Sequence, residues 1–245
     1  MRRTSPNCAF IAREQERLLA SLTNENAPTI VAALEDLATS ERCARFRDVF
    51  AARLDAVTVL MDAPHDPHNG AAIIRSCDAF GVHRLHVIER LEEFLAARSV
   101  ARGSERWVDV HSYTTVGQAI DALRASGHAL IATHPEGELT PRDLASIPRF
   151  ALVLGNERDG IHHELFEACE RTVRIPMRGF AESLNVSVTA AILLEHATFG
   201  RPGDLDPAEQ TRLYARALAL SVAHAPKILD AMGIRIDRSE FPPDA

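Results

Sequence analysis

The stretch from Ile175 to His196, IPMRGFAESLNVSVTAAILLEH, changes character near its centre. It begins at the end of a short apolar segment of the kind that forms strands, and it crosses a glycine at Gly179. At Ser183-Leu184-Asn185 a strongly helical run opens. Packing of a hydrophobic core does not require a polar Ser-x-Asn pair at this point. We therefore expect a loop whose backbone faces a ligand, followed at once by a helix N-terminus.

Upstream of this stretch, short apolar runs alternate with helical patterns. We expect strands at Val57–Met61, Leu85–Ile88, Trp107–His111, His128–Thr133, Phe150–Leu154 and Thr172–Ile175. We expect helices at Asn69–Phe80, Leu91–Val100, Thr115–Ser126, Ile161–Cys169 and Leu184–Phe199. Six strands rich in Val, Ile and Leu, alternating with helices, predict a mostly parallel α/β sheet with flanking helices.

Both ends of the chain show helical spacing of apolar residues. At the N-terminal end this spacing covers Ile11–Leu22, Thr29–Thr39 and Glu41–Leu54. Near the C-terminal end a helical hairpin is expected at Pro207–Ala223 and Pro226–Met232. We therefore predict a helical extension over residues 1–53, an α/β domain over 54–200, and a linker, helices and tail over 201–245.

The bulk composition is that of an ordinary soluble protein, with 46% hydrophobic and 25% charged residues among 245. No apolar run approaches the roughly 20 residues of a membrane span, and we expect neither a membrane segment nor a signal peptide. Four scattered cysteines without a CxxC pair fit free thiols in the cytoplasm. The net charge of −7 does not by itself favour a nucleic-acid partner.

The residues after the first expected strand exclude several enzyme classes. Residues 62–70 are DAPHDPHNG, a stiff polar loop with two prolines in place of the glycine-rich turn that holds a dinucleotide. This counts against an NAD-dependent oxidoreductase and against the common Rossmann-type methyltransferases. The hydrolase and P-loop signatures are missing as well. Eleven histidines occur without the three or four converging ligands of a zinc motif, so we expect no metal site.

Polar residues follow three of the expected strands, at the edge of a parallel sheet where ligands bind. The first loop leads to Asn69, which could cap a helix, and to Arg75, which could be a surface arginine. The second loop, LGNERDGI over residues 154–161, has two glycines that permit a tight turn with exposed backbone. Its Glu157 could simply be an acid near a helix start. In the third loop, Ser183 or Asn185 could cap the last long helix.

The three loops together resemble the signature motifs of the SpoU/TrmH family, the SPOUT-class RNA 2′-O-methyltransferases. Residues 68–76, HNGAAIIRS, and the continuation DAFGV resemble motif one, and residues 154–161 resemble motif two. The opening stretch resembles motif three, in particular that of the TrmH-type tRNA methyltransferases. The likeness spans about residues 47–200, and Gly103-Ser104-x-x-Trp107 adds to it. One motif is weak support, whereas three in order, each after a predicted strand, are strong support.

The resemblance implies a cofactor, a site and a fold. S-adenosylmethionine would be the methyl donor, bound by Thr133, Gly155, Ile175 and Leu184. The predicted catalytic residues are Asn69, Arg75, Glu157, Ser183 and Asn185, and no metal is implied. The family fold is an α/β sheet whose C-terminal part forms a deep trefoil knot, which would fall at about residues 150–200. The resemblance also implies a cytoplasmic homodimer in which the partner subunit completes each active site.

The substrate remains open at this stage. The resemblance favours methylation of a guanosine in the tRNA D-loop, with ribosomal RNA as an alternative and a catalytically silent RNA-binding paralogue as another. The last long helix ends in EHATFG at residues 195–200, where the family commonly has basic residues that hold tRNA. We expect arginines of the N-terminal helices to compensate for them, namely Arg42, Arg45, Arg47 and Arg53.

Overall fold

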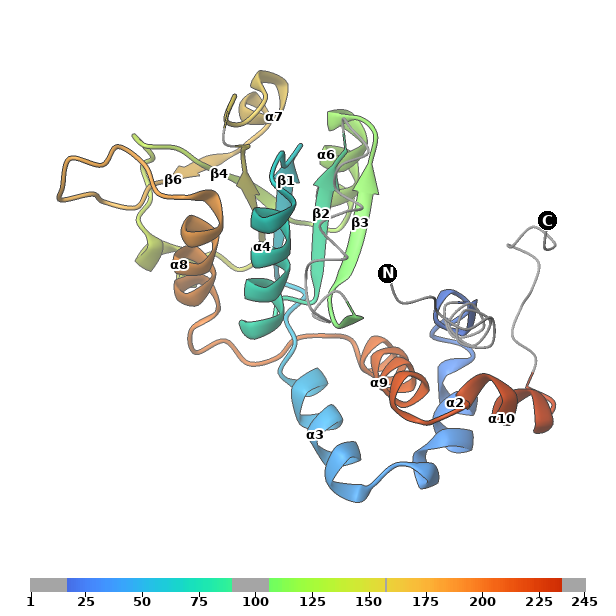
Figure 1. The fold of residues 1–245 in the computed structure, drawn as a ribbon. Helices are drawn as coiled ribbons and strands as arrows, with labels where there is room; N and C mark the ends of the chain where they lie inside the picture. The colour runs from blue at the N-terminus through green and yellow to red at the C-terminus, as the bar shows by residue number, and fades with distance from the viewer. Residues whose placement is uncertain (1–16, 90–105, 157, 235–245) are drawn as a thin grey trace, which may run out of the picture. The chain divides into compact units, whose positions relative to one another are not determined.

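The computed structural model describes residues 17–89, 106–156 and 158–234. The expected helix at Leu91–Val100, the pair Gly103-Ser104 and Glu157 lie outside the described residues. The chain divides into two compact units, one formed by residues 1–52 with 205–245 and the other by residues 53–204 (Figure 1). Each unit is described by itself.

The unit of residues 53–204 is built on a six-stranded sheet in which all neighbouring strands pair in parallel. Its strand order is β3-β2-β1-β5-β4-β6. The strands are β1 (Val57–Asp62), β2 (Arg84–Ile88), β3 (Asp109–Tyr113), β4 (Ala129–Thr133), β5 (Phe150–Leu154) and β6 (Arg171–Val173). The parallel α/β sheet predicted from the apolar runs is confirmed, and the central strands β1 and β5 are buried along their whole length.

Helices cover both faces of this sheet. They are α4 (Pro67–Ala79), α6 (Val116–Ala125), α7 (His163–Glu167) and α8 (Val186–Thr198), with a 3-10 helix η3 (Pro141–Ser146). The helices α4 and α8 lie side by side and share one core with the sheet (Figure 1). The other core contains α6 and α7. Neighbouring residues of one strand divide between these cores, as Leu130 and Ile131 do, because successive side chains of a strand point to opposite faces.

Three elements begin two residues later than expected. The strand β3 starts at Asp109 rather than Trp107, where its pairing with Arg84 of β2 begins. The helix α8 starts at Val186, because the side chain of Asn185 accepts a hydrogen bond from the Ser187 amide and caps it. The helix α7 is confined to His163–Glu167. The structure also contains η3, which the sequence patterns did not predict.

The strand β6 has a neighbour on each side. One is β4, and the other is Leu139, whose amide donates to the Thr172 carbonyl and whose carbonyl accepts from the Arg174 amide, both at 2.9 Å. Gly137 makes this approach possible, because an added Cβ would lie 2.5 Å from the Val173 carbonyl carbon. The connection from β4 to η3 therefore passes around β6.

The other unit is helical. It contains α2 (Ala27–Leu34), the 3-10 helix η1 (Glu35–Leu37), α3 (Ser40–Ala51), α9 (Pro207–Ser221) and α10 (Ala225–Ala231). The helix α9 packs against α2 and α3, so segments from both ends of the chain share one core. Tyr214 of α9 donates a 2.8 Å hydrogen bond to Glu35, which also pairs with Arg47. In the part of the chain that the structure describes, no helix has the length and apolarity needed to cross a membrane.

Candidate functional site

A pocket of about 430 Å³ lies at the carboxyl ends of β4, β5 and β6. Thr133, Gly155 and Val173, which end or follow these three strands, form part of its wall. Its volume is in the range of small-molecule sites, and the carboxyl edge of a parallel sheet is where such sites occur. The fold thus provides a ligand site at the edge where the sequence places its polar loops.

The pocket brings together most of the residues predicted from the motifs. The four predicted cofactor residues, Thr133, Gly155, Ile175 and Leu184, all line it. Ser183 and Asn185 line it too. The lining also includes residues that the sequence did not single out, among them His134, Arg174, Glu182 and Thr189. Arg174 and Glu182 directly flank predicted positions, which was the only signal that could have pointed to them.

The second loop is a tight turn that needs glycine. The amide of Asn156 donates to the Gly160 carbonyl at 3.0 Å, and the Gly160 amide donates back at 3.1 Å. The Asn156 side chain accepts from the amides of Arg158 and Asp159. A Cβ on Gly155 would lie 2.3 Å from the Gly160 carbonyl carbon, and Gly160 has φ +70°. The two glycines therefore let the loop close on itself beside the pocket.

The third loop offers its backbone to the pocket. Among the described residues, the backbone of 175–184 makes no hydrogen bond to another backbone group. Ile175, Ser183 and Leu184 of this segment line the pocket. Backbone amides and carbonyls that have no backbone partner among the described residues can bond to water or to a ligand. The loop expected from the sequence therefore lines the pocket, and that its backbone faces a ligand stays a prediction.

Asn69 and Asn185 join the first and third loops. The Asn185 side-chain amide donates to Asn69 Oδ1 at 3.0 Å, while Asn185 Oδ1 accepts from the Ser187 amide at 2.8 Å. The capping interpretation of Asn69 is wrong, because Asp66 caps α4 by accepting from the His68 amide. Asn69 lies in the first turn and is buried. For Asn185, capping and membership of the pocket are both observed.

Two predicted catalytic residues are not placed in the pocket wall. Arg75 is exposed on α4 and does not line the pocket. Asn69 does not line it either, and is connected to it through Asn185. Glu157 lies outside the described residues. The catalytic roles of these residues stay predictions.

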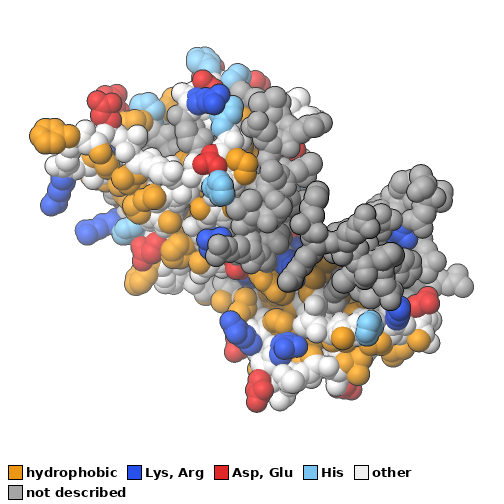
Figure 2. All heavy atoms as spheres, in the orientation of Figure 1, with side chains coloured by type: hydrophobic (Ala, Val, Ile, Leu, Met, Phe, Trp, Pro, Cys, Tyr) orange, Lys and Arg blue, Asp and Glu red, His pale blue; other side chains and the backbone are white. Residues whose placement is uncertain are grey.

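Arg53 cannot serve the RNA-binding role expected of it. Its side chain is 1% exposed and forms an ion pair with the carboxylate of Asp78. Arg42 and Arg45 are exposed on α3. On the face drawn in Figure 2, basic and acidic side chains of the described residues are interspersed. The basic residues available for RNA are therefore fewer than the sequence indicated.

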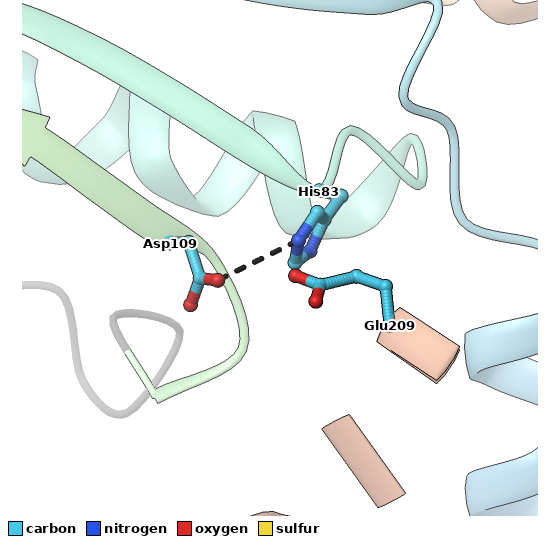
Figure 3. Close-up of side chains that lie close together, drawn as sticks. All are labelled: His83, Asp109 and Glu209. Carbon is cyan, nitrogen blue, oxygen red and sulfur yellow. Dashed lines mark ion pairs between the residues drawn. The ribbon is translucent and has the colours of Figure 1, made fainter. Parts of the chain in front are cut away.

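The opposite edge of the sheet holds a contact between a histidine and a carboxylate. His83 Nε2 lies 3.5 Å from an oxygen of Asp109, and the pair joins the beginnings of β2 and β3 (Figure 3). Glu209, which Figure 3 also labels, belongs to the helical unit. Because the pocket lies at the carboxyl ends of the strands, this pair is not part of its wall.

Fold and pocket together define a parallel α/β protein with a pocket of small-molecule size between the loops that follow β4, β5 and β6. Comparison with known proteins narrows this class. The family model described as the SpoU rRNA Methylase family matches residues 56–195. The chain belongs to this family, whose methyl donor is S-adenosylmethionine. The resemblance inferred from the three motifs is confirmed.

Individual relatives agree with the family assignment. The chain is 36% identical to the tRNA (guanosine(18)-2′-O)-methyltransferase of Escherichia coli K12 over 157 residues, which is 64% of this chain and 69% of that protein. The solved A. aeolicus TrmH/SpoU tRNA modifying enzyme is 28% identical with a TM-score of 0.66, covering 75% of this chain and 98% of that one. The SpoU methyltransferase AviRb from Streptomyces viridochromogenes, solved with AdoMet, is 31% identical with a TM-score of 0.51, covering 62% and 60%.

Proposed function

We propose that this protein transfers a methyl group from S-adenosylmethionine to a ribose 2′-hydroxyl of tRNA, at the guanosine named for its E. coli relative. The observation that carries the proposal is the pocket at the sheet edge, with all four predicted donor-binding residues in its wall. The family membership supplies the reaction class. The tRNA substrate is supported by the relative's name and by the TrmH-like third motif.

The pocket fits the methyl donor in size and chemistry. A volume of about 430 Å³ suits a nucleoside-sized ligand. The backbone of residues 175–184, which makes no backbone hydrogen bond among the described residues, can bond the edge of an adenine, and the side chains of Ile175, Leu184 and Leu193 give apolar surface. Arg174 and Glu182 are opposite charges in the wall that match a carboxylate and an ammonium group. When bound, the donor supplies a methyl group on a positively charged sulfur.

The chain's own residues would position the ribose and manage its proton. The 2′-oxygen forms a bond to the methyl carbon as the bond from that carbon to sulfur breaks, and the hydroxyl proton must leave. Arginine is always charged, so it is a poor base. Arg75 therefore holds the adjacent phosphate and steers the 2′-oxygen, and the phosphate or a water takes the proton. Asn69, Glu157, Ser183 and Asn185 form the polar surroundings of the site.

We further propose that two copies of the chain form the working enzyme in the cytoplasm. Arg75 is exposed on α4 and away from the pocket wall of its own chain, which fits a site completed by a partner subunit. Val188 on α8 and Phe180 in the third loop are exposed apolar residues that a partner could cover. The passage of the 134–139 connection around β6 supports the threading of a trefoil knot within residues 150–200.

Ribosomal RNA is the second candidate substrate, because the family model is described for rRNA methylases. Mapping 2′-O-methyl groups in total RNA from a strain that lacks the protein separates the candidates. Loss of one tRNA guanosine methylation supports the proposal, and loss of a ribosomal one transfers it to the alternative. No change in either RNA, with donor binding absent in the purified protein, leaves a silent RNA-binding protein and contradicts the proposal.

A further inference from the structure

Asp62 is a buried carboxylate at the end of the central strand β1. Its side chain is 1% exposed, and the strand that it ends is buried throughout. Pairing of Asp62 with Ile88 of β2 fixes its backbone. Acidic side chains are rarely buried this completely unless they have a partner. The motifs of the sequence assign no role to this residue.

The carboxylate reaches the second loop. The backbone amide of His162 donates to Asp62 Oδ2 at 2.6 Å, across 100 positions of the chain. His162 directly follows Gly160 and Ile161, which both line the pocket. The bond therefore anchors the point at which the second loop leaves the pocket and turns into α7. The 2.6 Å separation is at the short end for such a bond, so the anchor is a close one.

The first loop starts at the same residue. Ala63 has φ +46°, which is sparsely populated for residues other than glycine, and its amide donates to the Ile88 carbonyl at 3.0 Å. From this fixed turn the chain runs to Asp66, the cap of α4, and on to Asn69. Backbone in such a conformation is kept where the surroundings hold it, often beside functional sites. Asp62 is thus the point where the first and second loops meet.

We propose that Asp62 is a positioning residue of the methyl-donor pocket, which holds Gly160 and Ile161 in place through the His162 amide. It does not line the pocket itself. The identity of the ligand in this proposal rests on the proposed function, whereas the anchor rests on geometry alone. Without the bond, Gly160 and Ile161 lose the hydrogen bond that ties the residue after them to Asp62.

The sharpest test removes the hydrogen-bond donor, the His162 amide, rather than the Asp62 carboxyl group that accepts the bond. His162 has φ −58° and an exposed side chain, so its φ already suits proline. His162→Pro deletes the amide hydrogen, and His162→Ala keeps it, which makes the alanine variant the matched control. Asp62→Ala removes the acceptor, and Asp62→Asn keeps an oxygen at the same place.

A second control separates positioning from general stability. Asp55 lies just before the other end of β1 and accepts from Arg149 at 2.8 Å and from Arg84 at 3.3 Å. Asp55→Ala weakens the same sheet far along the strand from the pocket. Its Tm should fall, while its affinity for S-adenosylmethionine should stay within twofold of that of the wild type.

Two quantities are measured. Calorimetry at a temperature below the Tm of every variant gives the dissociation constant of S-adenosylmethionine. Hydrogen exchange reports on the backbone amides of residues 160–162. We expect His162→Pro and Asp62→Ala to raise the dissociation constant at least tenfold. Asp62→Asn should recover most of the affinity, and His162→Ala should match the wild type. In Asp62→Ala the His162 amide should exchange faster, while the amides of β4 keep their protection.

Wild-type affinity in both His162→Pro and Asp62→Ala would overturn the inference, as would an equal loss in Asp55→Ala. If the wild type itself does not bind S-adenosylmethionine, the proposed function fails. The exchange experiment still decides the anchor in that case, because unchanged exchange at His162 in Asp62→Ala contradicts it. If Asp62→Ala does not fold, the His162→Pro and His162→Ala pair gives the same decision.

Discussion

The side-chain amide of Asn185 donates to Asn69 Oδ1 at 3.0 Å and joins two helix starts that lie 116 positions apart in the chain. One end of this bond belongs to the pocket wall and the other to α4, which also carries Arg75. The bond therefore couples the place where the ligand binds to the helix that carries the predicted catalytic arginine. Its two ends can be altered separately.

Replacing Asn185 by Asp tests this coupling. Aspartate caps a helix as well as asparagine, so the stability of α8 should be kept. It cannot donate to Asn69, so the methyl-transfer rate should fall about tenfold, because the group that connects the loops is lost. Asn185→Ala loses the cap as well, and its unfolding free energy should drop by about 1 kcal/mol more. Chemical denaturation and single-turnover kinetics measure the two effects. Equal rates for Asn185→Asp and the wild type would remove the coupling from the mechanism.

Replacing Arg75 by Ala should lower the methyl-transfer rate about 100-fold, since a positioned cation is lost from the reacting site. The affinity for S-adenosylmethionine should stay the same, because Arg75 does not line the pocket. Kinetics with tRNA measure the methyl-transfer rate, and calorimetry with S-adenosylmethionine measures the affinity. Arg142→Ala on η3, another exposed arginine, is the control and should retain full activity. A normal rate in Arg75→Ala would exclude the proposed role.

Replacing Gly155 by Ala should disrupt the pocket. The new methyl group would lie 2.3 Å from backbone of Gly160, so the loop must move. We expect at least a tenfold loss of donor affinity and a destabilisation of about 1–3 kcal/mol. Gly117 in α6 has no heavy atom within 4 Å of an added Cβ, and Gly117→Ala should stabilise by up to about 1 kcal/mol. Thermal unfolding and calorimetry compare the two. Unchanged binding in Gly155→Ala would show that the close contact is not required.

Stability should fall as the pH drops from about 6.5 towards 3. Burial, and then the charge of His111, lowers the pKa of His86 to about 3. Its hydrogen-bond partner is Tyr113, 2.8 Å away. In this window the unfolded chain binds a proton at His86 that the folded chain does not, so the loss approaches about 1.4 kcal/mol per pH unit. Burial lowers the pKa of His128 as well, so it adds to the loss.

Urea unfolding at pH 7 and pH 4.5 measures this dependence, with His86→Leu as the test variant. The variant should show a smaller difference between the two pH values than the wild type. Part of the difference should remain, because His128 is unchanged. An identical pH dependence in the variant would assign the effect to other groups.

The strands were predictable because strands such as Phe150–Leu154 are buried on both faces. Such strands appear in the sequence as continuous apolar runs, without alternating polar and apolar residues. Pocket-lining residues were predictable where they lie directly at a strand end, as Gly155 and Thr133 do. The burial of Arg53 could not be predicted from local sequence, because its partner Asp78 lies 25 positions further along the chain. For α4, Pro67 after Asp66 was the available sign that Asp66 rather than Asn69 is the cap.

Other features depend on segments that meet only in the fold. The sequence of residues 175–184 does not reveal that their backbone groups lack partners within the described chain, because a partner could lie anywhere. The sequence shows Asp62 as an acid directly after an apolar run, yet its bond to the His162 amide depends on how two distant loops come together in the fold. Local patterns thus located the elements, and long-range pairing defined the roles of single residues.

The enclosure of β6 between β4 and Leu139 has a consequence for biosynthesis. When a nascent chain has emerged only as far as Ile161, it contains five of the six strands and the first two loops but not the third loop. The pocket is then open on the side that residues 173–186 will form. Docking of this last segment adds the final strand and completes the binding site in one event, so a prematurely terminated chain has most of the sheet and no place for its cofactor.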